Sequence, residues 1–96
     1  MPQMITIDQQ SFIAYQIQTP HTSAMLITAR AGFLACAYFD VTIAEKVGDA
    51  AAIVTGVKTL DDMLDASVVR VSSAASMLGV VVGMSGRDAL LKLNEA

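Results

Sequence analysis

The stretch GFLACAYFD, residues 32–40, constrains the fold more than any other, because the positions from 33 to 39 are apolar in succession. A strand of this kind carries hydrophobic side chains on both faces and must be covered on both. A second β-prone segment, AMLITA, precedes it across a turn at residues 30–32. We therefore expect a central strand with helices on one face and a neighbouring subunit on the other.

Apolar residues are in excess over the whole chain. Hydrophobic residues make up 54% of the 96 positions and charged residues 16%, whereas an average soluble domain has about a quarter charged residues. The longest apolar runs, Ala31–Phe39 and Met77–Met84, are too short for a membrane span, which needs roughly 20 residues. The opening MPQMITID has no basic stretch followed by an apolar core, so it predicts neither a signal nor a transit peptide.

The surplus apolar surface predicts self-association. A small chain leaves much of its apolar surface in water unless something covers it. Because a membrane span is excluded, we expect other copies of the chain to cover this surface. The net charge of -3 and the scattered bases provide no basic footprint for nucleic acid. The single cysteine cannot form an intrachain disulfide and fits a reducing compartment. We therefore predict a cytoplasmic homo-oligomer with neither nucleic acid nor membrane as its partner.

The N-terminal part of the chain predicts four antiparallel strands. In SFIAYQIQT, the apolar residues Ile13, Tyr15 and Ile17 alternate with small or polar residues, which is the pattern of a half-buried strand. A β-prone run at Met4–Asp8 precedes it and completes a hairpin. The two segments on either side of the turn at 30–32 form a second pair.

After Asp40 the sequence predicts helices. Asp40 is a candidate N-cap for a helix over Val41–Val47, and Gly48 is a candidate left-handed residue at its end. One longer helix from 45 to 54 is the alternative, because a glycine inside a helix costs only about 1 kcal/mol relative to alanine. We expect the break at Gly48, with a strand following it.

The remaining elements complete an α+β fold. Capping motifs at Thr59–Asp62 and Ser85–Asp88 predict two helices, the apolar spacing after Val71 predicts another that stops at Gly79, and Ala50–Val54 and Ser67–Ser72 favour strands. We expect one compact domain over residues 1–96. Residues 1–39 form a β-rich oligomerisation region with an antiparallel sheet of about four strands, and residues 40–96 add short helices and one or two further strands.

Several motifs together resemble the YunC-like family of small bacterial and archaeal proteins. They are Gly32 and Cys36 followed by Asp40, the segment AEKVGDAAAIVTGVKTLDDML, and the segment VSSAASMLGVVVGMSGRDALLKL. The resemblance implies an N-terminal β region that builds a tetramer, and it implies no known activity or cofactor. Members of this family often have glycine after the cysteine, where this chain has Ala37. The added methyl group puts in doubt any role that needs a close approach to the thiol.

Cys36 is either a reactive thiol or a small core residue. A reactive thiol needs a helix N-terminus, an imidazole or a cation beside it, whereas apolar surroundings favour the inert neutral form. His21 is the only imidazole in the chain, and Asp40 lies at the end of the cysteine strand. These three residues are the candidate catalytic group. Simpler structural roles also account for two of them, because His21 can be a solvated turn residue and Asp40 can be a helix cap. One histidine and one cysteine are too few ligands to predict a metal site.

Glycine-rich segments raise the question of phosphate binding. GVKT lacks the upstream glycine of a P-loop, and GMSGR lacks the second glycine of a nucleophile elbow. What remains is two helix N-termini with a cation beside each, which is a general anion-binding arrangement, although Asp62 and Asp88 already occupy that field. The candidate anion-binding residues are Lys58, Thr59, Ser85, Gly86 and Arg87.

Three classes of function remain open from the sequence. The leading hypothesis is an oligomer of unknown biochemical function, a tetramer joined through its N-terminal strands. The alternative is a small enzyme or a protein that binds an anionic metabolite in an intersubunit pocket near Cys36. The third is a module that offers a sheet edge or an apolar patch to another protein.

Overall fold

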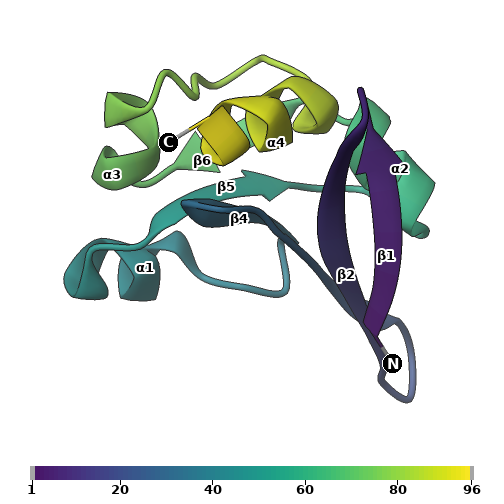
Figure 1. Cartoon of the computed structure of the whole chain (residues 1–96). Helices are drawn as coiled ribbons and strands as arrows, with labels where there is room; N and C mark the ends of the chain where they lie inside the picture. Colours follow the sequence, from purple (N-terminus) through teal and green to yellow (C-terminus); the bar gives the residue numbers. More distant parts are fainter. Residues whose placement is uncertain (1, 96) are drawn as a thin grey trace.

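One mixed sheet of six strands carries helices on both of its faces (Figure 1). The computed structural model describes residues 2–95. The strands are β1 (Pro2–Ile7), β2 (Gln10–Gln18), β3 (Ser23–Thr28), β4 (Gly32–Cys36), β5 (Ala50–Val54) and β6 (Val68–Val71), and the helices are α1 (Val41–Val47), α2 (Leu60–Asp65), α3 (Ser73–Met77) and α4 (Gly86–Glu95). The order of the strands in the sheet is their order in the chain. The predicted α+β class is confirmed.

The first four strands form the predicted antiparallel run. The turn between β1 and β2 consists of Asp8 and Gln9, whose φ angles of 51° and 68° are those of a tight hairpin. The prediction was wrong about the end of the fourth strand, which stops at Cys36 and not at Phe39. The N–H of Phe39 donates to the carbonyl of Cys36 at 3.1 Å, and this bond closes a turn in place of further pairing.

The pairing of β4 with β5 is parallel, which the sequence analysis did not predict. A parallel pair needs a crossover connection, and α1 is that connection. Asp40 caps the start of α1, and Gly48, with a φ of 85°, ends it in the left-handed conformation. The predicted break between this helix and β5 is therefore confirmed.

The main core lies between one face of the sheet, called here the inner face, and the helices α2, α3 and α4. α1 packs against β5 on the opposite, outer face, so β4 and β5 are covered on both sides (Figure 1). The strand residues of the main core are Ile7, Phe12, Ala14, Met25, Ile27, Leu34, Cys36, Ala50, Ala52, Val54 and Val68, and the helices add Met63, Leu64, Ala75, Ala89, Leu90 and Leu93.

The predicted caps of the later helices are present. Thr59 and Asp62 form the reciprocal capping box of α2, and the hydroxyl of Ser85 accepts the N–H of Asp88 at 3.1 Å at the start of α4. Helix α3 begins later than the apolar spacing predicted, because Ser72 caps it and the pairing of β6 continues to Val71. No helix within residues 2–95 is both long enough and apolar enough to cross a membrane.

The strand β2 is half-buried as predicted, and its apolar stripe faces outward. Phe12 and Ala14 point to the inner face and are fully buried. Ile13, Tyr15 and Ile17 lie on the outer face and are 42%, 37% and 61% exposed. The hairpin therefore has apolar residues on both faces, and the core of this chain covers only one of them.

Candidate functional site

Cys36 is the last residue of β4 and belongs to the main core. Its side chain is 6% exposed, and its Sγ accepts the backbone N–H of Met25 at 3.3 Å. It lies opposite Val54, the last residue of β5, in the parallel pair. The sulfur thus lies at the carboxyl ends of the two parallel strands, just behind the surface.

The chain leaves these two strand ends toward opposite faces of the sheet. After β4 it enters α1, which lies on the outer face, and after β5 it enters α2, whose Met63 and Leu64 belong to the main core on the inner face. In open α/β sheets, a divergence of this kind opens a crevice at the carboxyl ends of the strands, where ligands bind.

A pocket of about 370 Å³ lies at this edge, between the β2–β3 loop and the segment before α2. We call it the loop pocket. Met25, whose N–H bonds to the sulfur of Cys36, forms part of its wall. The other lining residues are Gln18, Thr19, Pro20, His21, Thr22, Ser23 and Lys58. The structure therefore brings His21 and Lys58 to one pocket, which Cys36 itself does not line.

The inner face of the sheet changes from apolar to polar as it reaches the loop pocket. Along β2, the buried Phe12 and Ala14 are followed on the same face by Gln16 and Gln18. Gln16 donates through Nε2 to the hydroxyl of Ser23 at 3.4 Å, and that hydroxyl donates to Oε1 of Gln18 at 3.0 Å. These bonds hold the polar side chains that separate the core from the pocket.

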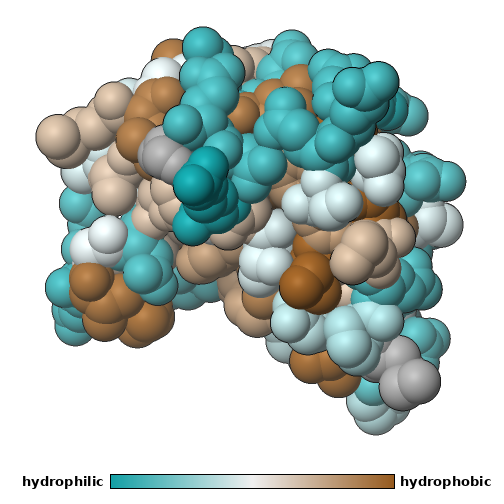
Figure 2. All heavy atoms as spheres, viewed as in Figure 1, coloured by the Kyte–Doolittle hydropathy of each residue, from teal (hydrophilic) through white to brown (hydrophobic). Residues whose placement is uncertain are grey.

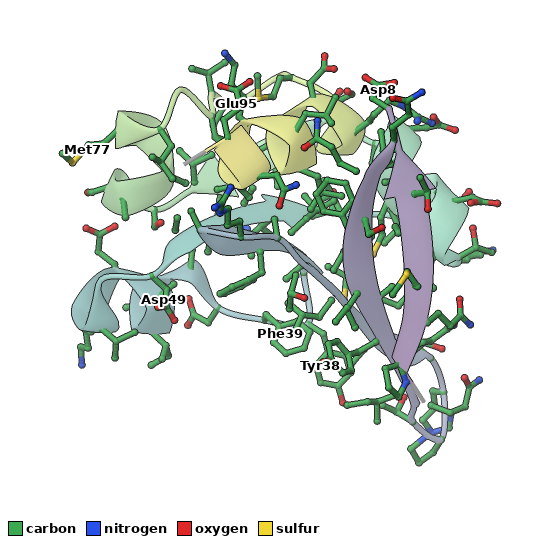
Figure 3. All side chains as sticks on the ribbon, in the orientation of Figure 1. Asp8, Tyr38, Phe39, Asp49, Met77 and Glu95 are labelled. Atoms are coloured by element: carbon green, nitrogen blue, oxygen red, sulfur yellow. The ribbon has the colours of Figure 1, made fainter. Side chains whose placement is uncertain are left out.

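Asp40 lies elsewhere. Its carboxylate accepts the N–H of Thr42 at 2.9 Å as the cap of α1. It lines two pockets around the turn after β4, a largely apolar one of about 310 Å³ and one of about 380 Å³ that Arg70 also lines. In Figure 3, the neighbouring Tyr38 and Phe39 project between α1 and the β1–β2 hairpin. Within one chain, the structure therefore does not assemble Cys36, His21 and Asp40 into a single catalytic group.

The helix N-termini proposed as anion sites have internal partners. The carboxylate of Asp62 accepts the backbone N–H groups of Lys58 and Thr59 at 3.0 and 3.2 Å. At the start of α4, the buried Gly86 donates its N–H to the carbonyl of Ala66 at 2.9 Å. The five candidate anion residues also separate into two places, because Ser85, Gly86 and Arg87 begin α4 and only Lys58 lines the loop pocket.

No metal-binding group emerges from the described part of the chain. Among residues 2–95, no three side chains of the types His, Cys, Asp and Glu come close enough together to hold an ion.

Comparison with known proteins identifies the family. A family model described as a domain of unknown function, DUF1805, matches residues 35–93. The chain belongs to the DUF1805 family. The match begins in β4 and includes Cys36, both segments that carried the YunC-like resemblance, the helices α1, α2 and α3, and most of α4.

Two relatives extend the likeness of this DUF1805 chain to its N-terminal strands. The uncharacterized protein YunC of Bacillus subtilis (strain 168) is 41% identical in an alignment of 93 residues that covers 93% of this chain and 92% of that protein. The crystal structure of TA1206, a protein of unknown function from Thermoplasma acidophilum, superposes with a TM-score of 0.91 at 33% identity, covering 97% of this chain and 91% of that one. The expected YunC-like membership is confirmed, and the family carries no assigned activity.

The polar end of β2 in this DUF1805 chain was not predicted from the sequence. The signal was present in the even-numbered positions of the strand, where Phe12 and Ala14 give way to Gln16 and Gln18. Such a change from apolar to polar along one face marks the point at which a strand leaves the core. The odd-numbered residues Ile13, Tyr15 and Ile17 form the more apolar pattern, which makes the change along the other face less apparent.

Acid is expected to remove the contribution of Asp40 to the stability of this DUF1805 chain. Hydrogen bonds from the backbone and then the side chain of Thr42, with a smaller effect of the Arg70 charge, hold the pKa of Asp40 below its ordinary value of 3.8. A lowered pKa stabilises the folded state above the unfolded value and ceases to do so as the pH falls through the folded value. The stability difference between wild type and Asp40→Ala should therefore shrink below pH 3.8.

Thermal unfolding of both proteins between about pH 6 and about pH 2.5 measures this difference. Asp40→Asn is the matched control, because asparagine also caps helices and does not titrate. The difference between Asp40→Asn and Asp40→Ala should stay constant over the same range. If wild type remained more stable than Asp40→Ala by the same amount down to the lowest pH, the ionised carboxylate of Asp40 would not be the source of the stabilisation.

Proposed function

We propose that this protein is a cytoplasmic homo-oligomer, a tetramer, that assembles through the outer face of its N-terminal strands. The observation that carries the proposal is a continuous set of exposed apolar side chains on that face. We call this set the outer stripe, and it consists of Met4, Ile13, Tyr15 and Ile17.

The register of the sheet makes the outer stripe continuous. Met4 of β1 lies directly opposite Ile13 of β2, and Tyr15 lies opposite the half-buried Leu26 of β3. Met4 is 70% exposed. Figure 2 shows hydrophobic surface on the arm that β1 and β2 form at the lower right, and again around α1 at the lower left. Apolar side chains gathered in this way mark a surface that another molecule covers.

Self-association is favoured over a foreign partner for two reasons. The excess of apolar residues belongs to the whole chain, and a small domain has too little interior to bury it alone. The YunC-like resemblance implies four copies joined through this same region. A two-fold interface also places each outer stripe against an identical apolar surface, so the two surfaces match in chemistry.

Charging the outer stripe is expected to dissociate the assembly. Sedimentation velocity of the wild-type chain should give four times the 10.1 kDa of one copy. The double variant Ile13→Asp with Ile17→Asp should sediment as a monomer. The free energy needed to bury four or more unpaired carboxylates at the interface is far larger than the free energy gained from its apolar contacts.

The matched control is Val81→Asp with Val82→Asp, which also introduces two carboxylates at exposed valines, 54% and 60% accessible, outside the outer stripe. This variant should keep the wild-type mass. A wild-type protein that sediments at 10.1 kDa at micromolar concentration would contradict the proposal outright. Retention of the full mass by the Ile13 and Ile17 variant would place the interface elsewhere and would contradict it as well.

A further inference from the structure

We propose that the loop pocket binds a small dianionic group, a phosphate or a dicarboxylate, through the side chains of Lys58, His21 and Gln18. This site is separate from the outer stripe. It gathers residues that are distant in the sequence, since His21 follows β2 and Lys58 follows β5.

The charge of the lining selects for an anion. Lys58 supplies a positive charge, and the imidazole of His21 supplies an N–H donor in either protonation state. Among the described residues that line the pocket, none is acidic. A charged donor and neutral donors around one hollow, with no carboxylate in the wall, bind a small anion in preference to a cation.

Asp62 bonds to the backbone of the segment that carries Lys58 and holds that segment in place. Its Oδ2 accepts the backbone N–H groups of Lys58 and Thr59, and its own N–H donates to the hydroxyl of Thr59 at 3.0 Å. The carboxylate is therefore engaged with the start of α2. These bonds fix the backbone of Lys58, so the lysine side chain is presented from a held position and a ligand need not order the loop.

The hydrogen bonds at the polar end of β2 set the direction of Gln18. Because its Oε1 accepts the hydroxyl of Ser23, its Nε2 remains as the hydrogen-bond donor of that amide. Gln18 lines the pocket, so this donor adds to Lys58 and His21. Across the loop, Thr19 both accepts the N–H of Thr22 and donates to its carbonyl, at 3.0 Å in each case, and thereby holds His21 between them.

Location and size agree with a ligand site. The pocket lies at the edge of the sheet where β2, β4 and β5 end, and its walls are the β2–β3 loop, Met25 of β3 and Lys58, which follows β5. Its volume of about 370 Å³ is at the lower end of the range for small-molecule pockets. A metabolite of a few carbon atoms with one phosphate or two carboxylates fits that volume.

Isothermal titration calorimetry of the full chain with inorganic phosphate and, separately, with malonate tests the proposal. At least one of the two anions should bind saturably with one site per chain. Lys58→Met should weaken that binding by about tenfold or more, because it removes a charge-assisted hydrogen bond. Gln18→Leu and His21→Ala should each weaken it by several-fold.

Lys46→Met is the matched control, because it removes the same charge from an exposed position on α1, far from the lining residues. It should leave the affinity within about twofold of wild type. Saturable binding of phosphate alone identifies a phosphorylated ligand, and binding of malonate alone identifies a dicarboxylate. Absence of saturable binding for both anions overturns the proposal, and so does equal weakening by Lys46→Met and Lys58→Met. Sedimentation of Lys58→Met should match wild type, which separates a failure of this site from a failure of assembly.

Discussion

Replacement of Gly86 by alanine is expected to lower the free energy of unfolding by about 3 kcal/mol or more. Gly86 is the first residue of α4, and its backbone lies against the C-terminal part of α2. A Cβ at this position would overlap the carbonyl oxygen of Met63 and would lie 2.9 Å from Cδ2 of Leu34. The helix must then move away from the sheet, which disrupts the contacts of Leu90 and Leu93 in the main core.

Urea unfolding monitored by circular dichroism measures this loss. Gly83→Ala is the matched control, because nothing lies within 4 Å of a Cβ at Gly83 and only its φ of +101° opposes a side chain. Strain of that kind costs roughly 1–2 kcal/mol. Equal losses for the two variants would show that conformation, and not the close approach of α4 to α2, explains the glycine at position 86.

Ser72→Ala is expected to cost about 3 kcal/mol through the loss of a buried hydroxyl. Ser72 is 1% exposed, and its Oγ donates to the carbonyl of Asp49 at 2.7 Å and accepts the N–H of Ala51 at 2.9 Å. The same oxygen accepts the N–H of Ala75 at 3.4 Å as the cap of α3. Alanine would leave the N–H of the fully buried Ala51 without a partner and would uncap the helix.

The control for this prediction is Ser76→Ala on the same helix. Ser76 is exposed, and alanine has the higher helix propensity, so this variant should unfold within about 0.5 kcal/mol of wild type. Urea unfolding of the two variants gives the comparison. A loss below about 1 kcal/mol for Ser72→Ala would mean that water replaces the hydroxyl and that the start of β5 does not depend on it.

Local chemistry made the elements predictable. The limits of α1 follow from a carboxylate cap at Asp40 and a left-handed glycine at Gly48, and both act within a few residues of the helix. The capping box of α2 is of the same kind. Features that short-range hydrogen bonds decide can be found by inspection of the sequence.

The buried side of the hairpin was not predictable from its own pattern. Phe12 and Ala14 face the core, although Ile13, Tyr15 and Ile17 form the more apolar stripe. The choice depends on where α2 and α4 lie relative to the sheet, which is decided by segments far along the chain. The parallel pairing of β4 and β5 escaped prediction for the same reason, because it depends on how α1 crosses the sheet.

The groups that the sequence suggested for the candidate site differ from those in the structure. His21 and Lys58 were both singled out for their chemistry, and the structure places them together around the loop pocket. Asp40 was grouped with Cys36 because it is close in sequence, yet the turn after β4 carries it away to cap α1. Spacing along the chain cannot show which side chains share a pocket when the residues come from different strand connections.

The sheet is ordered as the chain is ordered, and this has a consequence for how the protein is made. Each strand from β2 to β6 pairs with the strand synthesised just before it, so the sheet can extend as the chain leaves the ribosome, with no early strand waiting for a distant partner. The helix α4, in contrast, is synthesised last although it covers strands that are made much earlier. Leu90 and Leu93 of α4 close the inner face, so the growing sheet keeps its apolar side open until those ten residues arrive.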